Sequence, residues 1–223
     1  NQTSDRRGAG GLIKELNQQG KSFVPNYLAG IQELSIKNKT IDIKYKNAYR
    51  GRIQVWTPTI FRLQVEKEGH DFTDRPEPSQ ADKPAHILIK DFTDTEDFEV
   101  KLKESDQDYQ VLTSAYTASL DKNQGTLKVY QKGASRPIIQ ELHPLSLSPQ
   151  GTSQTLKANE DTYYFGGGIQ NGRFSHKGKR INIVNENNWV DGGVASPNPF
   201  YWTTDGYGVL RHTFKPGYYD FAS

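Results

Sequence analysis

The sequence predicts an all-β chain in which many short antiparallel strands pack as a sandwich or a barrel. Apolar and polar residues alternate with period two over most of the chain, and helical periodicity is nearly absent. Turn signals rich in Gly, Asn, Asp and Pro recur about every 8 to 12 residues. Aromatic residues make up 11% of the chain, with 12 Tyr against 10 Phe, so rings with polar edges supply much of the apolar filling.

The chain begins with a polar segment and continues with two predicted hairpins. Residues 1–20 are polar and Gly-rich without periodicity, so we expect a tail or linker before one domain over residues 21–223. Residues 34–45 alternate on both sides of a turn, which predicts the first hairpin. Residues 52–66 predict the second, because Pro58 has no N–H and interrupts the ladder between two alternating runs.

A proline-rich loop and a series of evenly spaced strands follow. The predicted strands are residues 87–89, 98–102, 109–112, 116–120, 126–130 and 137–142. Acidic residues gather at 91–97, but a calcium loop needs several oxygens that converge on one point, and this spacing does not force them to. We therefore predict a solvated loop and no cofactor, and a structural calcium ion is left open.

Composition excludes several classes of partner and site. The net charge is +2, from 28 basic and 26 acidic residues with interleaved signs, so the basic stripe of a nucleic-acid binder is missing. No apolar run approaches the roughly 20 residues that a membrane-spanning helix needs. Cysteine is absent, which excludes disulfides and Cys-ligated zinc. Methionine is also absent, so Asn1 is not a translation start, and a signal peptide could have preceded it.

Residues 163–221 concentrate Gly, Asn and aromatic side chains between short apolar strands. Gly permits positive φ, Asn offers both a donor and an acceptor, and Tyr and Trp offer flat faces with a polar rim. A pyranose has a flat C–H face and a rim of hydroxyls, so this mixture suits sugar recognition. For isolated Gly and Tyr residues we prefer tight turns and core packing. For the cluster from Asn185 to Asp191 we prefer a role in sugar binding.

Motifs of self-contained catalysis are missing. The run Gly166-Gly167-Gly168 lacks the spacing of a dinucleotide loop and no helical pattern follows it. The five His are scattered without metal-ligand spacing, and His176, in a turn-rich segment, is expected to be exposed. No Ser lies in a Gly-x-Ser-x-Gly elbow. We therefore predict no catalytic residue and no metal site in this chain.

A series of motifs resembles one enzyme family in order and spacing. The motifs are Thr57-Pro58 with Phe61-Arg62-Leu63, Leu112-Thr113-Ser114, Tyr164-Phe165-Gly166-Gly167-Gly168, Asn198-Pro199-Phe200-Tyr201 and Asp205-Gly206-Tyr207-Gly208. Over about residues 47–221 the chain resembles the N-terminal β-sandwich of glycoside hydrolase family 31, the α-glucosidases and α-glucosyltransferases. The glycine motif departs from the usual Tyr-Gly-Leu-Gly-Glu. Together with residues 170–173 and 175–178, this form of the motif resembles that of the branch of enzymes that form and break down cycloalternan.

The resemblance implies a two-sheet antiparallel β-sandwich of the galactose-mutarotase-like type, beside a (β/α)₈ barrel. In the family, two barrel aspartates cleave the glycosidic bond with retention of configuration. Neither is present here, so we expect a domain truncated before its last strands and the barrel. The expected partners are the C-terminal remainder of the same polypeptide and an α-glucan oligosaccharide. We also expect a secreted or cell-surface bacterial protein and leave a cytoplasmic location open.

One loop of the sandwich touches sugar in this family, often through Asn-Thr-Asp. Asn185-Glu186-Asn187 corresponds to it, so the resemblance implies that Asn187 and Asn188 bind hydroxyls. It also implies a stacking surface at Trp189 and a weaker contact at Asp191. A plug between sandwich and barrel is an equal alternative for Trp189. Tyr201 and Trp202 are expected mainly in the core or at an interface.

The function that the resemblance implies is that of a non-catalytic N-terminal domain in a retaining α-glucan enzyme. We expect an α-glucosyltransferase of the cycloalternan-forming type, to which this domain supplies a substrate-contacting loop. The alternatives are the same domain of a hydrolytic α-glucosidase, or a free-standing carbohydrate-binding module. A sugar epimerase is a weaker third alternative, because similarity of fold to a mutarotase does not carry its activity.

Overall fold

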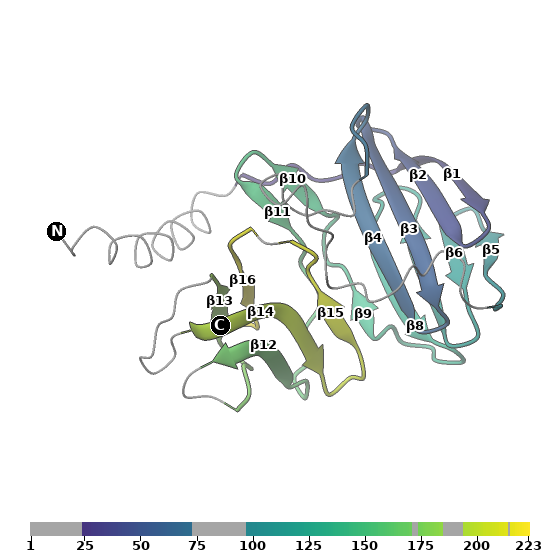
Figure 1. Cartoon of the computed structure of the whole chain (residues 1–223). Helices are drawn as coiled ribbons and strands as arrows, with labels where there is room; N and C mark the ends of the chain where they lie inside the picture. Colours follow the sequence, from purple (N-terminus) through teal and green to yellow (C-terminus); the bar gives the residue numbers. More distant parts are fainter. Residues whose placement is uncertain (1–23, 73–96, 171–173, 185–193, 214) are drawn as a thin grey trace. The chain divides into compact units, whose positions relative to one another are not determined.

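The computed structural model describes residues 24–72, 97–170, 174–184, 194–213 and 215–223 (Figure 1). The chain divides into two units by contacts within it. The N-terminal unit consists of Val24–Asp74 and Ala85–Lys157. The C-terminal unit consists, among the described residues, of those in Ala158–Ser223. The described residues form strands and no helix, as the period-two pattern predicts.

The N-terminal unit contains two antiparallel sheets that share one core (Figure 1). The first sheet follows the chain: β1 (Ile31–Lys37), β2 (Thr40–Tyr45), β3 (Tyr49–Thr57) and β4 (Ile60–Lys67). The second also follows the chain: β5 (Lys101–Glu104), β6 (Asp108–Leu112), β7 (Tyr116–Asp121), β8 (Leu127–Gln131) and β9 (Ile139–Gln140). A separate hairpin pairs β10 (Ser146–Ser148) with β11 (Gly151–Ser153).

Strict alternation of side chains explains the core between these sheets. Ile41 and Ile43 on β2 and Ile53 on β3 point inward, whereas their neighbours along each strand are more exposed. Val111 and Leu120 contribute from the second sheet. Each fully buried aliphatic side chain stabilises the fold by roughly 1.5–3 kcal/mol. The sequence pattern therefore determines which face of each strand is buried.

The structure confirms both predicted hairpins and shifts two later strands. The predicted strand at 98–102 begins only at Lys101, because Phe98 packs against the core without joining the ladder. The strand predicted over 137–142 pairs only through Ile139–Gln140. The tail at 1–20, the strand at 87–89 and most of the acidic segment at 91–97 lie outside the described residues.

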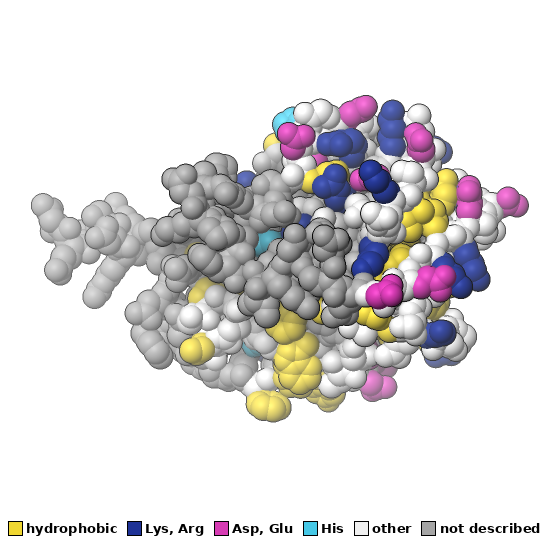
Figure 2. Space-filling view, turned by 45° about the vertical axis from the view of Figure 1, so that its right-hand side comes forward, with side chains coloured by type: hydrophobic (Ala, Val, Ile, Leu, Met, Phe, Trp, Pro, Cys, Tyr) yellow, Lys and Arg dark blue, Asp and Glu magenta, His cyan; other side chains and the backbone are white. Residues whose placement is uncertain are grey.

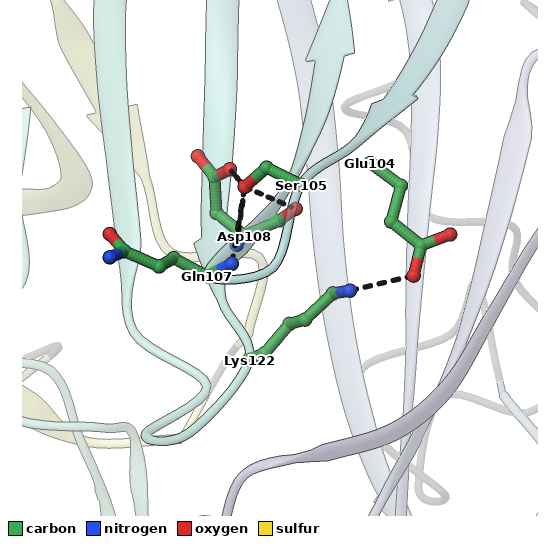
Figure 3. Close-up of polar contacts among 5 residues, drawn as sticks. All are labelled: Glu104, Ser105, Gln107, Asp108 and Lys122. Atoms are coloured by element: carbon green, nitrogen blue, oxygen red, sulfur yellow. Dashed lines mark hydrogen bonds and ion pairs between the residues drawn. The ribbon is translucent and has the colours of Figure 1, made fainter.

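Polar contacts close the hairpin between β5 and β6 (Figure 3). The Ser105 Oγ donates to Asp108 Oδ1 over 2.6 Å and accepts the backbone N–H of Gln107 and of Asp108 over 3.2 and 3.1 Å. Lys122 Nζ lies 2.6 Å from Glu104 Oε1. These contacts join residues of the turn and of the strands beside it. We therefore interpret this group as structural.

The C-terminal unit contains two smaller sheets around a second core. β12 (Tyr164–Gln170), β14 (Val194–Thr203) and β15 (Gly208–Leu210) form one sheet in that order. β13 (Arg180–Ile183) pairs with β16 (Gly217–Asp220). The core between them is ring-rich: Tyr164, Tyr201 and Phe221 pack with Ile181 and Ile183. Together with the N-terminal unit, these antiparallel sheets confirm the predicted all-β, sandwich-like class.

Candidate sugar-binding loop and its supporting strands

The predicted sugar-binding residues belong to the segment between β13 and β14. Asn187, Asn188, Trp189 and Asp191 all lie outside the described residues. Their roles therefore stay predictions. The described strands on either side show how the two ends of this segment are held.

Buried apolar residues hold the strand that enters the segment. Ile181, Ile183 and Val184 are buried, and β13 pairs with β16 from Arg180↔Asp220 to Ile183↔Gly217. Val184 is the last described residue before the segment, so the chain is buried up to that point. The burial of alternate residues in Arg-Ile-Asn-Ile is the period-two pattern of a half-buried strand.

The glycine motif of β12 sets the path of the strand that leaves the segment. Gly166 pairs with Tyr201 and Gly168 with Pro197, so a step of two residues on β12 faces a step of four on β14. Gly168 has φ of 76°, and a Cβ there would lie 2.2 Å from the carbonyl oxygen of Ser196. Only glycine combines this φ with so close a backbone approach. The extra residues therefore bulge on β14, and the glycines of β12 let the two backbones approach closely at this point.

His176 is buried, so the expectation of an exposed turn residue is wrong. Its side chain is 3% exposed, its backbone N–H donates to the Tyr164 carbonyl over 2.9 Å, and Nε2 donates to the Gly166 carbonyl over 2.8 Å. The ring also stacks on Phe221 with centroids 5.9 Å apart. The turn-rich context of His176 carries no signal of this burial, because Tyr164, Gly166 and Phe221 are distant from it in sequence.

Tyrosines dominate the core that supports the segment and carry no charge near neutral pH. Burial raises the pKa of Tyr201 and Tyr219, and raises that of Tyr207 to about 12. Tyr201 is buried, as predicted for a core residue. Trp202, predicted in the core or at an interface, is 48% exposed and lies on the opposite face of the same strand. The strand therefore has one core face and one open face.

Polar residues that sequence reasoning missed lie on the outer face of β13 and β16. The Arg180 guanidinium lies 3.5 Å from the centre of the Tyr218 ring. Asn182 pairs with Tyr218 in register, and its Oδ1 is buried without a hydrogen-bond partner among the described residues. The alternation of Arg180 and Asn182 with two isoleucines could have indicated this face. These residues place an amide and a cation–π pair close to the start of the predicted loop.

Across the described ranges, no three His, Asp or Glu side chains gather as a group that could hold a metal ion. The same ranges contain no helix long and apolar enough to cross a membrane. The polar and aromatic surroundings of β13 and β14 therefore remain the candidate site.

Comparison with known proteins agrees with this architecture. Residues 50–220 match the family described as the glycosyl hydrolase 31 N-terminal galactose mutarotase-like domain. No curated protein matches the sequence. A *Flavobacterium johnsoniae* dextranase of this family, solved with isomaltotriose, superposes with a TM-score of 0.76 at 14% identity, over 88% of this chain and 24% of that one.

Two further structures share the fold at greater distance. The cycloalternan-forming enzyme from *Listeria monocytogenes*, in complex with its pentasaccharide substrate, gives a TM-score of 0.63 at 12% identity over 82% of this chain and 17% of that chain. A family 31 α-xylosidase from a soil metagenome, complexed with xylose, gives a TM-score of 0.58 at 19% identity. The match covers 86% of this chain and 29% of that chain. This chain spans about a quarter of the length of the dextranase. The family match covers most of the chain, which therefore belongs to the N-terminal galactose mutarotase-like domains of glycosyl hydrolase family 31.

Proposed function

We propose that this chain is the non-catalytic N-terminal domain of a retaining α-glucan-active enzyme, an α-glucosyltransferase of the cycloalternan-forming type. Its role is to support the catalytic barrel and to hold the segment 185–191 against the bound glucan. The observation that carries this proposal is the family match over residues 50–220. The buried residues of β13 and the close backbone approach of β12 and β14 support it, because they hold the strands that flank that segment.

The different roles proposed for the barrel and for this chain follow from the chemistry of cleavage with retained anomeric configuration. A retaining glycosidase needs two carboxylates about 5–5.5 Å apart, one as nucleophile and one as acid/base. In the proposed enzyme, both belong to the barrel. The contribution of this chain is positioning: contacts that fix a sugar ring at the reaction centre lower the barrier through orientation.

Each residue of the proposed loop has a specific task. Asn187 and Asn188 each offer one amide donor pair and one acceptor to sugar hydroxyls. Trp189 offers a flat apolar face to a pyranose ring. Asp191 is a further, weaker hydroxyl acceptor. Because Asn187 stands where the family often has Asp, this part of the subsite is neutral.

A hydrolytic enzyme is the second candidate, and one observation favours it. The superposition on the dextranase, with a TM-score of 0.76, is better than that on the cycloalternan-forming enzyme, with 0.63. The choice between water and a sugar as acceptor belongs to the barrel in this proposal. A free-standing carbohydrate-binding module is the third candidate. It would bind glucan without any catalytic partner.

Product analysis of the complete polypeptide tests the proposal. Incubation with isomaltotriose and with maltopentaose, followed by ¹H NMR, should show retained anomeric configuration and longer transfer products. Release of glucose alone would support the hydrolase, and absence of any turnover would overturn the proposal. Asn187→Ala should lower kcat/KM by about tenfold, as expected for one lost hydrogen bond. The exposed turn residue Asn123, changed to Ala, serves as the matched control.

A further inference from the structure

A cleft of about 320 Å³ lies on the outer face of the first sheet, within the N-terminal unit. The turn between β1 and β2 and the outer side chains of β2 and β3 form its walls. Its volume is at the lower end of the range of about 300–1,000 Å³ that is typical of small-molecule sites. We propose that this cleft binds a small oxyanion, a carboxylate or phosphate group carried by a molecule of about the size of one sugar ring.

Regular pairing of the four strands brings the polar side chains of the cleft together. On β3 the outward side chains alternate with Ile53 and Val55, which are buried in the core. One row of paired positions crosses all four strands, through Lys37, Thr40, Gln54 and Arg62. In the adjacent row, Asp42 is the direct partner of Arg52. The cleft is therefore built on the ladder of the sheet.

Arg62 fixes the orientation of two groups of the cleft. Its Nε donates to Gln54 Oε1 over 3.1 Å, and the same oxygen accepts a second bond from Arg62 Nη2. Because a guanidinium only donates, the amide oxygen of Gln54 is the atom that faces Arg62, and the NH₂ group is left for another acceptor. The guanidinium also lies 4.8 Å from the centre of the Trp56 ring, which lines the cleft.

Hydrogen-bond donors predominate on the lining. Lys37 Nζ, Thr40 Oγ1 and Gln54 Nε2 donate to no acceptor among the described residues. Arg52 Nε lies 3.5 Å from Asp42 Oδ1, and the two terminal nitrogens of Arg52 have no acceptor in the same part of the chain. The walls therefore offer an ammonium, a hydroxyl, an amide NH₂ and a guanidinium to a ligand that accepts.

The cleft is also positively charged, with three cationic side chains and one carboxylate on its lining. Figure 2 shows Lys and Arg side chains in dark blue gathered on the N-terminal unit, with acidic side chains in magenta among them. The Lys39 carbonyl accepts the Val55 N–H over 3.0 Å, and Lys39 Nζ lies 4.3 Å from the centre of the Phe98 ring. The Arg52 guanidinium lies 4.5 Å from the centre of the Phe72 ring. These contacts restrict two of the three cations, so less rotamer freedom is lost when an anion binds.

This lining favours a small oxyanion over other ligands. Carboxylate and phosphate oxygens only accept hydrogen bonds when ionised, and charge-assisted bonds to Arg are roughly twice as strong as neutral ones. A neutral sugar offers hydroxyls that need acceptors as well as donors, and Asp42 is the one carboxylate on the walls. A polyanion such as a nucleic acid needs a basic stripe, which this chain of net charge +2 does not have.

Titration of the ¹⁵N-labelled 223-residue chain, followed by ¹H–¹⁵N NMR, tests the inference because shifts of the amide signals locate the ligand. Glucose, glucuronate, glucose 6-phosphate and inorganic phosphate are the probes. We expect the anions to shift the amides of residues 38–40 and 52–56, and glucose to leave them in place. Raising the salt concentration from about 20 mM to about 500 mM should weaken the binding. Tighter binding of glucuronate would identify a carboxylate ligand, and tighter binding of the phosphates a phosphate ligand.

Two variants of opposite expected effect test the lining itself. Gln54→Glu keeps the oxygen that accepts from Arg62 and replaces the NH₂ group with a charged oxygen, so it should weaken anion binding by at least about tenfold. Asp42→Asn removes the one carboxylate of the lining and should tighten the binding by about threefold. Gln131→Glu adds the same charge at an exposed position of the second sheet, and should leave the binding unchanged.

Three results would overturn the inference. They are equal binding of glucose and glucuronate, a folded chain that binds none of the anions, and a Gln54→Glu chain that binds them as tightly as the parent. Amide shifts that fall outside the cleft residues would also contradict it. None of these results touches the proposed loop at 185–191, which is tested by the kinetics of the complete polypeptide.

Discussion

His176 Nε2 donates a hydrogen bond to the carbonyl oxygen of Gly166 over 2.8 Å. The same residue donates its backbone N–H to the carbonyl of Tyr164 over 2.9 Å. One buried residue thus satisfies two carbonyls of β12, on either side of Phe165. Because the register of β12 with β14 becomes irregular just after Gly166, His176 stabilises the part of β12 that faces the bulge of β14.

Replacing His176 by Ala should lower the free energy of unfolding by about 2–4 kcal/mol. The change leaves the Gly166 carbonyl without its donor and opens a cavity beside Phe221. Chemical denaturation followed by near-UV circular dichroism measures the loss. His143→Ala, at an exposed residue, should cost less than about 0.5 kcal/mol. Equal losses of unfolding free energy in the two variants would show that the buried His176 contact does not stabilise the fold.

Gly168→Ala should destabilise the C-terminal unit by at least about 3 kcal/mol, because it combines an unfavourable φ with a clash. The new Cβ would lie 2.2 Å from the Ser196 carbonyl oxygen and 2.7 Å from the Asn198 nitrogen. Gly133 has a similar φ, 80° against 76°, with nothing within 4 Å, so Gly133→Ala isolates the backbone cost of roughly 1–2 kcal/mol. Denaturant midpoints that coincide for both variants would refute the close approach of β12 and β14.

Glu141 makes the stability of the N-terminal unit depend on pH. Burial raises the pKa of Glu141 to about 7, although Gln154 Nε2 and the Leu127 backbone N–H both donate to its carboxylate. Because the folded chain then holds this proton more tightly than the unfolded chain, stability is greatest below the unfolded value. It falls by roughly 3 kcal/mol as pH rises from about 4.5 through 7.

Glu141→Gln should remove this fall. The amide oxygen can still accept from Leu127, and Gln154 can turn its own oxygen toward the new amide nitrogen. We expect a higher free energy of unfolding than the parent at pH 8 and a flatter profile between pH 5 and 7, measured by urea denaturation. Glu160→Gln, at an exposed position, should leave the profile as in the parent. A parent profile that rises over this range would contradict the burial of an ionisable Glu141.

Local alternation was enough to predict the strands whose partners are adjacent in sequence. β2, β3 and β4 follow from short-range pattern and turn chemistry at Asn38 and Pro58. Phe98 shows the limit of this approach: it packs half-buried against the core, as an apolar residue should, but it does not join the ladder that the pattern predicts. Pairing depends on a partner strand, and the alternating pattern alone does not specify where that pairing begins.

Features that depend on distant partners could not be predicted. His176 is buried because β12 and Phe221 surround it, and these lie on opposite sides of it in sequence. Trp202 is exposed because the inward position is taken by Tyr201, and alternation alone does not say which of two adjacent rings faces the core. Composition indicated the cluster from Asn185 to Asp191, and the family resemblance supplied the roles of its individual residues. Asn187, Asn188, Trp189 and Asp191 lie outside the described residues and remain predictions.

The most direct test of the proposed role is the kinetics of Trp189 variants in the complete polypeptide. We expect Trp189→Ala to lower kcat/KM for the best oligosaccharide by about tenfold, with an unchanged unfolding midpoint, because a stacking surface at the reaction centre is lost. Trp189→Phe, which keeps a flat ring, should retain most of the activity. A Trp189→Ala enzyme with the kcat/KM of the parent would contradict the claim that this loop contacts the substrate.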